Sequence, residues 1–322
     1  KLERESQGTE GAEEPAGPTI NAGSGSEPPS IAADAKYVAM NGDDAWPGTE
    51  EQPWRNILPA FGKLEPGDTL VIRGGTYTES LAPQTDGLPG RPIHIRSFLE
   101  EEVIISDVDN CLNVTARKNL NFFGLMLQRP GVRWAIVDSS LNIVLEEISA
   151  QASLDPTDQP VVEHEGMLIL DSVSVEVVAN DLRGWHLLNT DGDSGGHSFA
   201  VRGSSQTIVR DSFFEGGTVT AFEMLGGRNN IAIHNRITNP RAGCVYLINT
   251  TEAFFIDNQV HGCGSDSADY STAIKVENAT SITVRGNLVY ESAEGILQWV
   301  DENNDVIRGG RFAHNTLVLN KA

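Results

Sequence analysis

Short runs in which apolar and polar residues alternate recur along the second half of the chain, and each repeat carries an asparagine near its end. The clearest example is STAIKVENATSITVRGNLVYE (271–291), which holds two such runs with a turn between them. The same order recurs in residues 220–239, 243–262 and 295–320. The landmark asparagines are separated by 23, 29 and 28 residues: Asn235, Asn258, Asn287 and Asn315. Self-similarity at this period is typical of a solenoid.

The apolar residues of these runs alternate at a spacing of two, as in β-strands, and form no helical i, i+3, i+4 stripe. Equivalent strands of successive coils would stack into parallel sheets, about 4.8 Å apart, around one core. The sequence therefore predicts an all-β fold, a parallel β-helix of about nine or ten coils, and the general crossover rule makes it right-handed. Eight residues are predicted to point into the core: Ile231, Ile233, Val245, Leu247, Ile274, Val276, Ile282 and Val284.

The landmark asparagines are predicted to form a buried column at a sharp bend, where each amide bonds to the next along the axis. The alternative is that they are ordinary turn residues.

The first 35 residues differ from the rest because they contain almost no large apolar side chain. In residues 1–30, two basic residues stand against six glutamates, and Gly, Pro and Ser are abundant. Such a segment cannot bury enough surface to fold, so residues 1–35 are predicted to be a disordered tether. A lead-in of this kind typically follows a removed secretion or lipoprotein signal, which would place a lipid anchor upstream; a remnant of an expression vector at its first residues is the alternative.

Residues 36–322 are predicted to be a single β-helix domain, with 36–66 as its N-terminal cap. Within the cap, Trp54, Ile57, Leu58 and Phe61 lie at helical spacing after Pro53, so a short amphipathic helix is expected to cover the open end of the solenoid.

The motifs around this helix are Y-V-x-x-N-G-D-D-x-x-P-G-T (37–49), P-W (53–54), P-G-D-T-L (66–70) and R-G-G-T-Y (73–77). They resemble the N-terminal cap of the pectate-lyase-like family of secreted right-handed parallel β-helix proteins. The resemblance covers about residues 37–107 by motif and the remainder by repeat pattern. It implies the fold and a secreted or cell-surface location, bacterial extracellular or periplasmic, and says little about the reaction.

The formal net charge of −22 excludes nucleic acid as an expected partner, since Coulomb repulsion would oppose binding. No apolar run approaches the ~18 residues of a membrane span, and a monomer is expected. The three cysteines are too few for a disulfide framework and lack metal-ligand spacing: Cys111, Cys244 and Cys263. We expect them to be small buried residues, although Cys244 and Cys263 fall about one coil apart and could pair in an oxidising compartment.

A local excess of positive charge lies between residues 201 and 241, where five arginines stand against three acidic residues. These arginines form a candidate basic strip for the carboxylates of an acidic polysaccharide: Arg202, Arg210, Arg228, Arg236 and Arg241. The alternative is that they are solvated turn residues.

Alignment of the coils on their asparagines brings Glu223, Tyr246 and Lys275 to one outward position of successive strands, about 4.8 Å apart. A base, an acid and a cation together are what β-elimination from a uronate needs. Lys275 is the candidate base, if neighbouring cations or desolvation lower its proton affinity. The competing interpretation is a surface lysine paired with Glu277 or Glu223.

Insertions interrupt the coils at 152–166 and 185–196, with a shorter one before Thr272, and insertions of solenoids usually gather on the binding face. Two acidic pairs in these loops are candidate Ca²⁺ ligands, although turn-forming aspartates are the alternative: Asp191, Asp193, Asp266 and Asp269. Residues 189–191 (N-T-D) also resemble a segment of polygalacturonase-type glycoside hydrolases. The adjacent pair of aspartates that those enzymes need on a later coil is missing after Asp44.

Together these features predict an extracellular carbohydrate-active β-helix protein, and more specifically a polysaccharide lyase acting on a uronate-containing polysaccharide. The main alternative is a non-catalytic β-helix that binds glycan or serves as a surface or adhesion module, because the fold does not decide between them. A polygalacturonase-type hydrolase is the third possibility.

Overall fold

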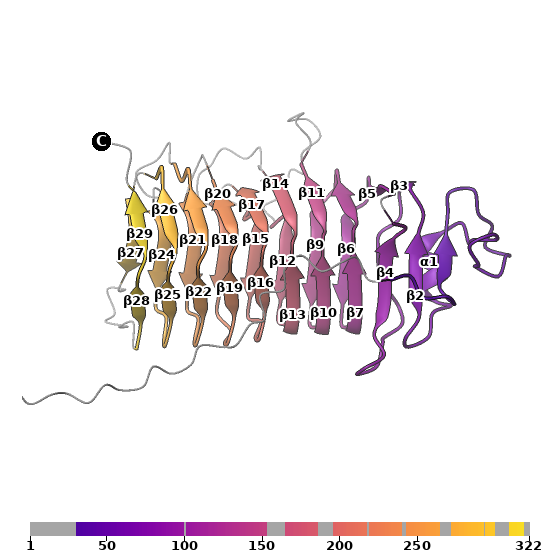
Figure 1. The fold of residues 1–322 in the computed structure, drawn as a ribbon, viewed down its shortest axis with the longest axis horizontal. Coiled ribbons are helices and arrows are strands. Elements are labelled where there is room, and N and C mark those ends of the chain that lie inside the picture. The colour runs from indigo at the N-terminus through magenta and orange to yellow at the C-terminus, as the bar shows by residue number, and fades with distance from the viewer. Residues whose placement is uncertain are drawn as a thin grey trace, which may run out of the picture. The chain divides into compact units, whose positions relative to one another are not determined.

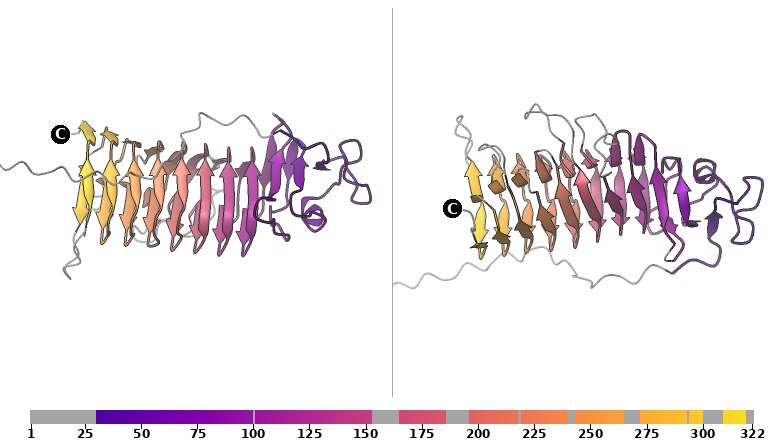
Figure 2. Two further views of the ribbon diagram at one scale, coloured as in Figure 1. Left: turned by 60° about the horizontal axis from the view of Figure 1, so that its bottom comes forward. Right: turned by 90° about the horizontal axis from the view of Figure 1, so that it is seen from above.

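A computed structural model describes residues 30–99, 101–152, 165–185, 196–217, 219–239, 243–264, 272–292, 294–299 and 309–318. Residues from Ile31 onward form one compact unit. Within it, short strands stack in three parallel sheets around a common core, as predicted (Figures 1 and 2). We name the sheets A, B and C in the order in which each coil visits them.

Each complete coil contributes one strand to each sheet, and the described N-terminal coils lack a strand in sheet C. Sheet A contains, in spatial order, β1 (Lys36–Val38), β2 (Thr69–Ile72), β4 (Ile93–Ser97), β7 (Lys118–Phe123), β10 (Leu141–Glu146), β13 (Val173–Val178), β16 (Ile208–Arg210), β19 (Ile231–Ile233), β22 (Phe254–Ile256), β25 (Thr283–Arg285) and β28 (Arg311–Ala313). Sheet B contains β3 (Gly75–Tyr77), β5 (Val103–Ser106), β8 (Met126–Gln128), β11 (Ser149–Gln151), β14 (Asp181–Trp185), β17 (Phe213–Gly216), β20 (Arg236–Thr238), β23 (Gln259–His261), β26 (Leu288–Tyr290) and β29 (Thr316–Val318). Sheet C contains β6 (Asn110–Thr115), β9 (Arg133–Asp138), β12 (Met167–Leu170), β15 (Phe199–Arg202), β18 (Thr220–Leu225), β21 (Gly243–Ile248), β24 (Thr272–Glu277) and β27 (Glu294–Trp299).

Six of the eight predicted core residues are fully buried in one continuous cluster: Val245, Leu247, Ile274, Val276, Ile282 and Val284. The prediction for Ile231 and Ile233 is wrong. Strand β19 is only three residues long, and its register aligns Ala232 with Val209 and Phe255, so Ala232 is the inward residue. The two isoleucines therefore lie on the outer face of sheet A.

The asparagine column is confirmed at the bend between sheets A and B. The Nδ2 of Asn235 donates to Oδ1 of Asn258 at 3.0 Å, and Asn258 donates to Asn287 in the same way at 3.1 Å. Each bend first takes a residue with positive φ, as at His234 (56°) and Asp257 (51°). The ladder residue comes next and accepts from the backbone of the previous coil, so one bend is repeated along the axis.

The N-terminal cap contains α1 (Ile57–Phe61), which is shorter than the predicted helix because Trp54 instead forms a bridge to Val38. Ile57 and Phe61 are buried, but Leu58 is 37% exposed, so the predicted apolar stripe is only partly correct. The carboxylate of Glu79 accepts the first backbone N–H groups of α1 at 3.2 and 3.1 Å, which satisfies donors that a helix leaves unpaired. No helix in the described ranges is long and apolar enough to cross a membrane.

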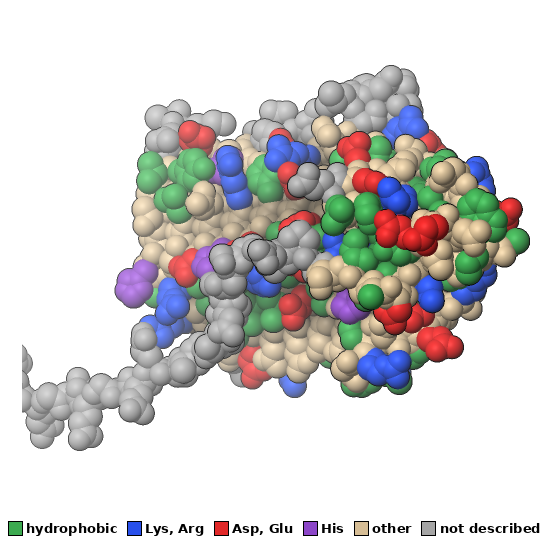
Figure 3. Space-filling model, turned by 45° about the vertical axis from the view of Figure 1, so that its right-hand side comes forward, with side chains coloured by type: hydrophobic (Ala, Val, Ile, Leu, Met, Phe, Trp, Pro, Cys, Tyr) green, Lys and Arg blue, Asp and Glu red, His purple; other side chains and the backbone are tan. Residues whose placement is uncertain are grey.

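The excess of acidic residues does not make one uniform field on the surface. Acidic and basic side chains lie interspersed on the face drawn in Figure 3. Close ion pairs account for part of this mixing, as between Arg73 and Glu101 at 2.8 Å. Local charge, rather than the total of −22, therefore decides what each face can bind.

Candidate functional site on the outer face of sheet C

The long insertions all join a strand of sheet B to the next strand of sheet C. Residues 153–164, 186–195 and 265–271 lie outside the described residues, and they directly precede the segments that enter β12, β15 and β24. Because insertions on one side of a solenoid often mark its binding face, the outer face of sheet C is the candidate site.

The predicted outward column exists on this face. Glu223 of β18 is in register with Tyr246 of β21, which is in register with Lys275 of β24. Lys275 Nζ lies 5.2 Å from the centroid of the Tyr246 ring and 2.8 Å from Oε2 of Glu277. The Lys275 side chain is 25% exposed, so it reaches solvent from a partly covered position.

Glu223 does not face Lys275 but belongs to a buried ion network on the preceding coils. Its Oε2 accepts from Arg202 Nε at 2.6 Å, and its Oε1 lies 3.2 Å from His197 Nε2. Arg202 Nη1 also lies 2.5 Å from Oε1 of Glu165. The other oxygen of Glu165 accepts from Arg133 at 3.1 Å, so two arginines alternate with two carboxylates.

His197 closes the network in its neutral form. Burial lowers the pKa of His197, although the Glu223 carboxylate opposes this. Its Nδ1 lies 2.7 Å from Oγ1 of Thr220. The same hydroxyl donates to the carbonyl of Phe222 at 3.3 Å, and burial favours the neutral imidazole over the imidazolium ion.

Glu165 is held as a carboxylate in spite of its burial. Burial alone would raise its pKa, but a backbone hydrogen bond and the charges of Arg202 and Arg133 outweigh it and lower the pKa. The network is therefore balanced, with two positive and two negative charges around a neutral imidazole.

The structure does not bring the candidate arginines together. Arg202 lies on sheet C, Arg210 on the outer face of sheet A, and Arg236 on sheet B. Arg228 lies in the turn before β19, where it bridges Ser205. Of the four described arginines, only Arg202 reaches the column that contains Lys275.

The remaining candidates fall outside the described residues: Arg241, Asp191, Asp193, Asp266 and Asp269. Among the residues that the structure describes, no group of three or more His, Cys, Asp or Glu side chains could hold a metal ion. The Ca²⁺ site therefore stays a prediction.

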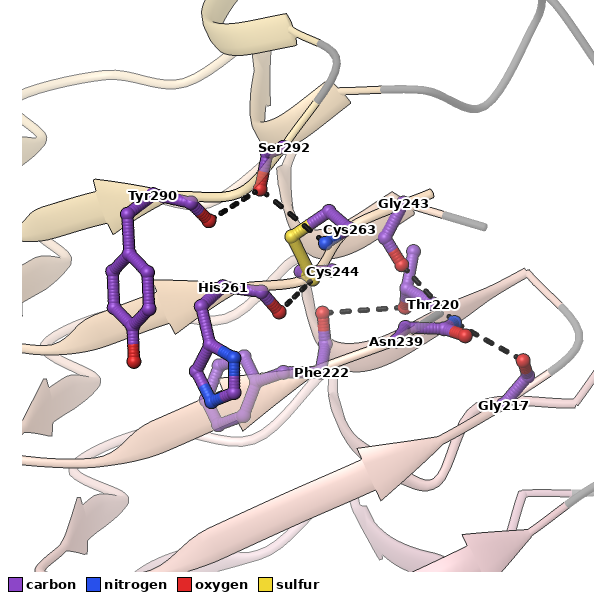
Figure 4. The surroundings of a disulfide bond; sticks show 10 residues. All are labelled: Gly217, Thr220, Phe222, Asn239, Gly243, Cys244, His261, Cys263, Tyr290 and Ser292. Carbon is purple, nitrogen blue, oxygen red and sulfur yellow. Dashed lines mark hydrogen bonds between the residues drawn. A yellow bond between two sulfur atoms is a disulfide. The ribbon is translucent and has the colours of Figure 1, made fainter. Parts of the chain in front are cut away.

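Cys244 and Cys263 form a disulfide, with their Cα atoms 5.5 Å apart (Figure 4). The sequence left this pairing open. Cys244 lies on β21 of sheet C and Cys263 follows β23, directly before the insertion at 265–271. The bond therefore ties the segment that follows β23 to β21, the strand that carries Tyr246. Cys111 is buried and unpaired, and burial raises the pKa of its thiol to about 12.

Sequence comparisons find one family model and two relatives that match part of the chain. A family model described as "Right handed beta helix region" matches residues 165–321. Pectate lyase PEL9 of Emericella nidulans is 34% identical over 79 residues, which are 24% of this chain and 19% of that protein. An uncharacterized Bacillus subtilis protein, YwoF, is 42% identical over 73 residues, 23% of this chain and 16% of the relative. The matches thus span less than a fifth of either relative.

Structural comparison extends the likeness over most of the chain. The crystal structure of pectate lyase Pel9A matches with a TM-score of 0.59 and 13% identity, covering 85% of this chain and 78% of that one. By fold, this chain is a right-handed parallel β-helix similar to that pectate lyase. A complex of XylC with xylose matches at a TM-score of 0.54 and 10% identity, covering 86% and 68% of the two chains.

Sequence reasoning missed three members of the buried ion network: Arg133, Glu165 and His197. The usable signal was their spacing, because consecutive members are 32 residues apart. The same separation relates ladder partners in these coils, such as Ser140 and Ser172. The earlier coils thus have their own period, which alignment on the later asparagines does not capture.

Proposed function

We propose that this protein is a carbohydrate-active enzyme that cleaves a uronate-containing polysaccharide by β-elimination on the outer face of sheet C. The fold likeness to a pectate lyase and to a xylose-bound protein supports a carbohydrate substrate. The observation that carries the proposal is the register of buried Tyr246 with Lys275, whose side chain is 25% exposed, on the outer face of sheet C.

Lys275 is the proposed base. Its amine takes the proton alpha to the uronate carboxylate, the electrons form a carbon–carbon double bond, and the bond to the glycosidic oxygen on the next carbon breaks. Glu277 Oε2 lies 2.8 Å from the Lys275 amine, so a cation that binds Glu277 would release the Lys275 side chain to the substrate. Tyr246, whose ring lies beside the amine, is the candidate donor of the proton that the leaving oxygen needs.

Arg202 is the proposed partner of a substrate carboxylate. Glu223 and Glu165 occupy its Nε and Nη1 and fix the guanidinium plane, while the side chain stays 31% exposed. An arginine has five N–H donors, so the Arg202 guanidinium retains donors for a ligand. We therefore assign Glu223 to positioning Arg202 rather than to proton transfer, because Glu223 is buried, its Oε2 accepts from Arg202, and its Oε1 lies 3.2 Å from His197 Nε2.

The location that fits this function is secreted or cell-surface. The Cys244–Cys263 disulfide supports it, since such bonds persist in oxidising compartments. The second candidate function is a non-catalytic glycan-binding β-helix, which the close pairing of Lys275 with Glu277 favours.

A screen of polyuronides separates the two candidates. A lyase yields an unsaturated product that absorbs in the ultraviolet, and we expect at least one polyuronide to give it. Binding of the same polymers without any new absorbance would support the binding module instead.

A further inference from the structure

A groove of about 350 Å³ lies on the outer face of sheet A, a different sheet from that of the candidate site. Its floor comes from β7, β10 and β13, and its wall is a short turn that begins at Leu88. This volume is within the range of small-ligand sites, which start at about 300 Å³.

Three groups of different chemistry form the floor in one row. Asn121, Val144 and Glu176 are in register on successive strands, so an amide, two methyl groups and a carboxylate lie about 4.8 Å apart. That spacing places polar groups on both sides of an apolar surface about as wide as one pyranose ring.

A second row on the same floor is oriented by hydrogen bonds. The Nδ2 of Asn142 donates to Oδ1 of Asn119 at 3.0 Å, and Asn119 Nδ2 donates to the carbonyl of Gly87 at 3.0 Å. These two hydrogen bonds fix the orientation of the Asn142 amide. Its carbonyl oxygen can then accept from a ligand hydroxyl.

The wall is rigid and apolar. Leu88 and Arg91 exchange two backbone hydrogen bonds of 3.0 and 2.8 Å around a turn in which Gly90 has a φ of +76°. Arg91 Nη2 donates to the carbonyl of Pro66 at 2.6 Å, which ties the turn to the preceding coil. Leu88 is 51% exposed, and Pro92 extends the apolar wall.

We propose that this groove binds one neutral glycosyl unit, a pyranose with adjacent hydroxyls. The Glu176 carboxylate accepts from two hydroxyls, the amides of Asn121 and Asn142 donate and accept around it, and the C–H face of the ring packs on Val144 and Leu88. Glu176 is the one charged residue among those that line the groove, so a uronate would be repelled. The site would hold a neutral residue of a polysaccharide on a face separate from the candidate catalytic column.

The test is a titration of the full chain with neutral methyl glycosides and with galacturonate, read by saturation-transfer NMR and calorimetry. We expect a neutral glycoside to bind and Glu176→Gln to weaken it by about tenfold, with Asn121→Ala acting in the same direction. The matched control Glu215→Gln removes a partly exposed carboxylate from sheet B and should bind like the parent.

Three results would overturn the proposal: no neutral glycoside binds, Glu176→Gln binds as tightly as the parent, or galacturonate binds more tightly than the neutral sugars. Circular dichroism of each variant checks that the coils remain intact. Binding is measured directly, so the result does not depend on whether the protein is a lyase.

Discussion

Arg202 Nε lies 2.6 Å from Oε2 of Glu223, so the carboxylate that the sequence offers for catalysis is engaged in holding an arginine. Glu223 is only 5% exposed, and its second oxygen lies 3.2 Å from Nε2 of His197. A buried carboxylate that is paired with an arginine is a poor proton acceptor for substrate. Glu223 therefore positions Arg202 and is not a catalytic residue. Of the four described candidate arginines, Arg202 is the one that reaches the column with Lys275.

Removing this support should destabilise the protein. Glu223→Ala leaves Arg202 and His197 without a shared acceptor in a buried site, so we expect a loss of about 3 kcal/mol in the free energy of unfolding. Glu277→Ala removes a pair nearer the surface and should cost less than ~1 kcal/mol. Urea denaturation measures both, and equal costs for the two variants would contradict the buried network.

Stability should depend on pH through His197. Burial lowers its pKa in the folded protein, so the unfolded chain binds a proton first as the pH falls below about 6.5. The free energy of unfolding is therefore highest above pH 6.5 and decreases on acidification, by up to ~1.4 kcal/mol per pH unit for this residue. His94 and His261, whose pKa values burial also lowers, add to the same trend.

The control is His197→Gln, whose amide can still donate to Glu223 but does not titrate. Thermal unfolding at pH 7.5 and 5.5 should show a smaller difference for this variant than for the parent. The same pH dependence in both proteins would show that His197 is not held neutral.

The disulfide should stabilise the coil that precedes the insertion at 265–271. Its two cysteines are 19 residues apart, and closing a loop of that size restricts the unfolded chain by about 3 kcal/mol. A reductant should lower the melting temperature of the parent and leave the double variant Cys244→Ser, Cys263→Ser unchanged. An identical response of the two proteins would argue against the bond.

Calcium is expected to be required for activity if the acidic insertions bind it. Calorimetry with CaCl₂ alone should show binding, and a chelator should abolish eliminase activity, which Ca²⁺ then restores. Two double variants identify which insertion binds calcium. The calcium affinity of Asp266→Asn, Asp269→Asn is compared with that of Asp191→Asn, Asp193→Asn. Full activity in excess chelator would remove calcium from the mechanism.

The sequence predicted the fold and the column because both depend on periodicity, which a single chain displays directly. Lys275 is placed outward by Ile274 and Val276, whose burial the alternation predicts. The same reasoning failed at Ile231, because a three-residue strand carries too little pattern to decide which face is inward. Arg133, Glu165 and His197 were missed because their 32-residue period differs from that of the later coils. The groove beside the Leu88 turn could not be predicted either, because the sequence does not show where a turn lies relative to a sheet.

The most direct test of the central claim is the eliminase activity of Lys275→Ala on the polyuronide that the parent cleaves. The substitution spares the core, because Ile274 and Val276 carry the packing of β24. The ultraviolet-absorbing product should then form ~10² to 10⁴-fold more slowly, with stability changed by no more than ~0.5 kcal/mol. Lys118→Ala, which removes an exposed lysine from sheet A, should retain the parent rate. Full activity in Lys275→Ala would contradict the assignment of the base and, with it, the proposed site.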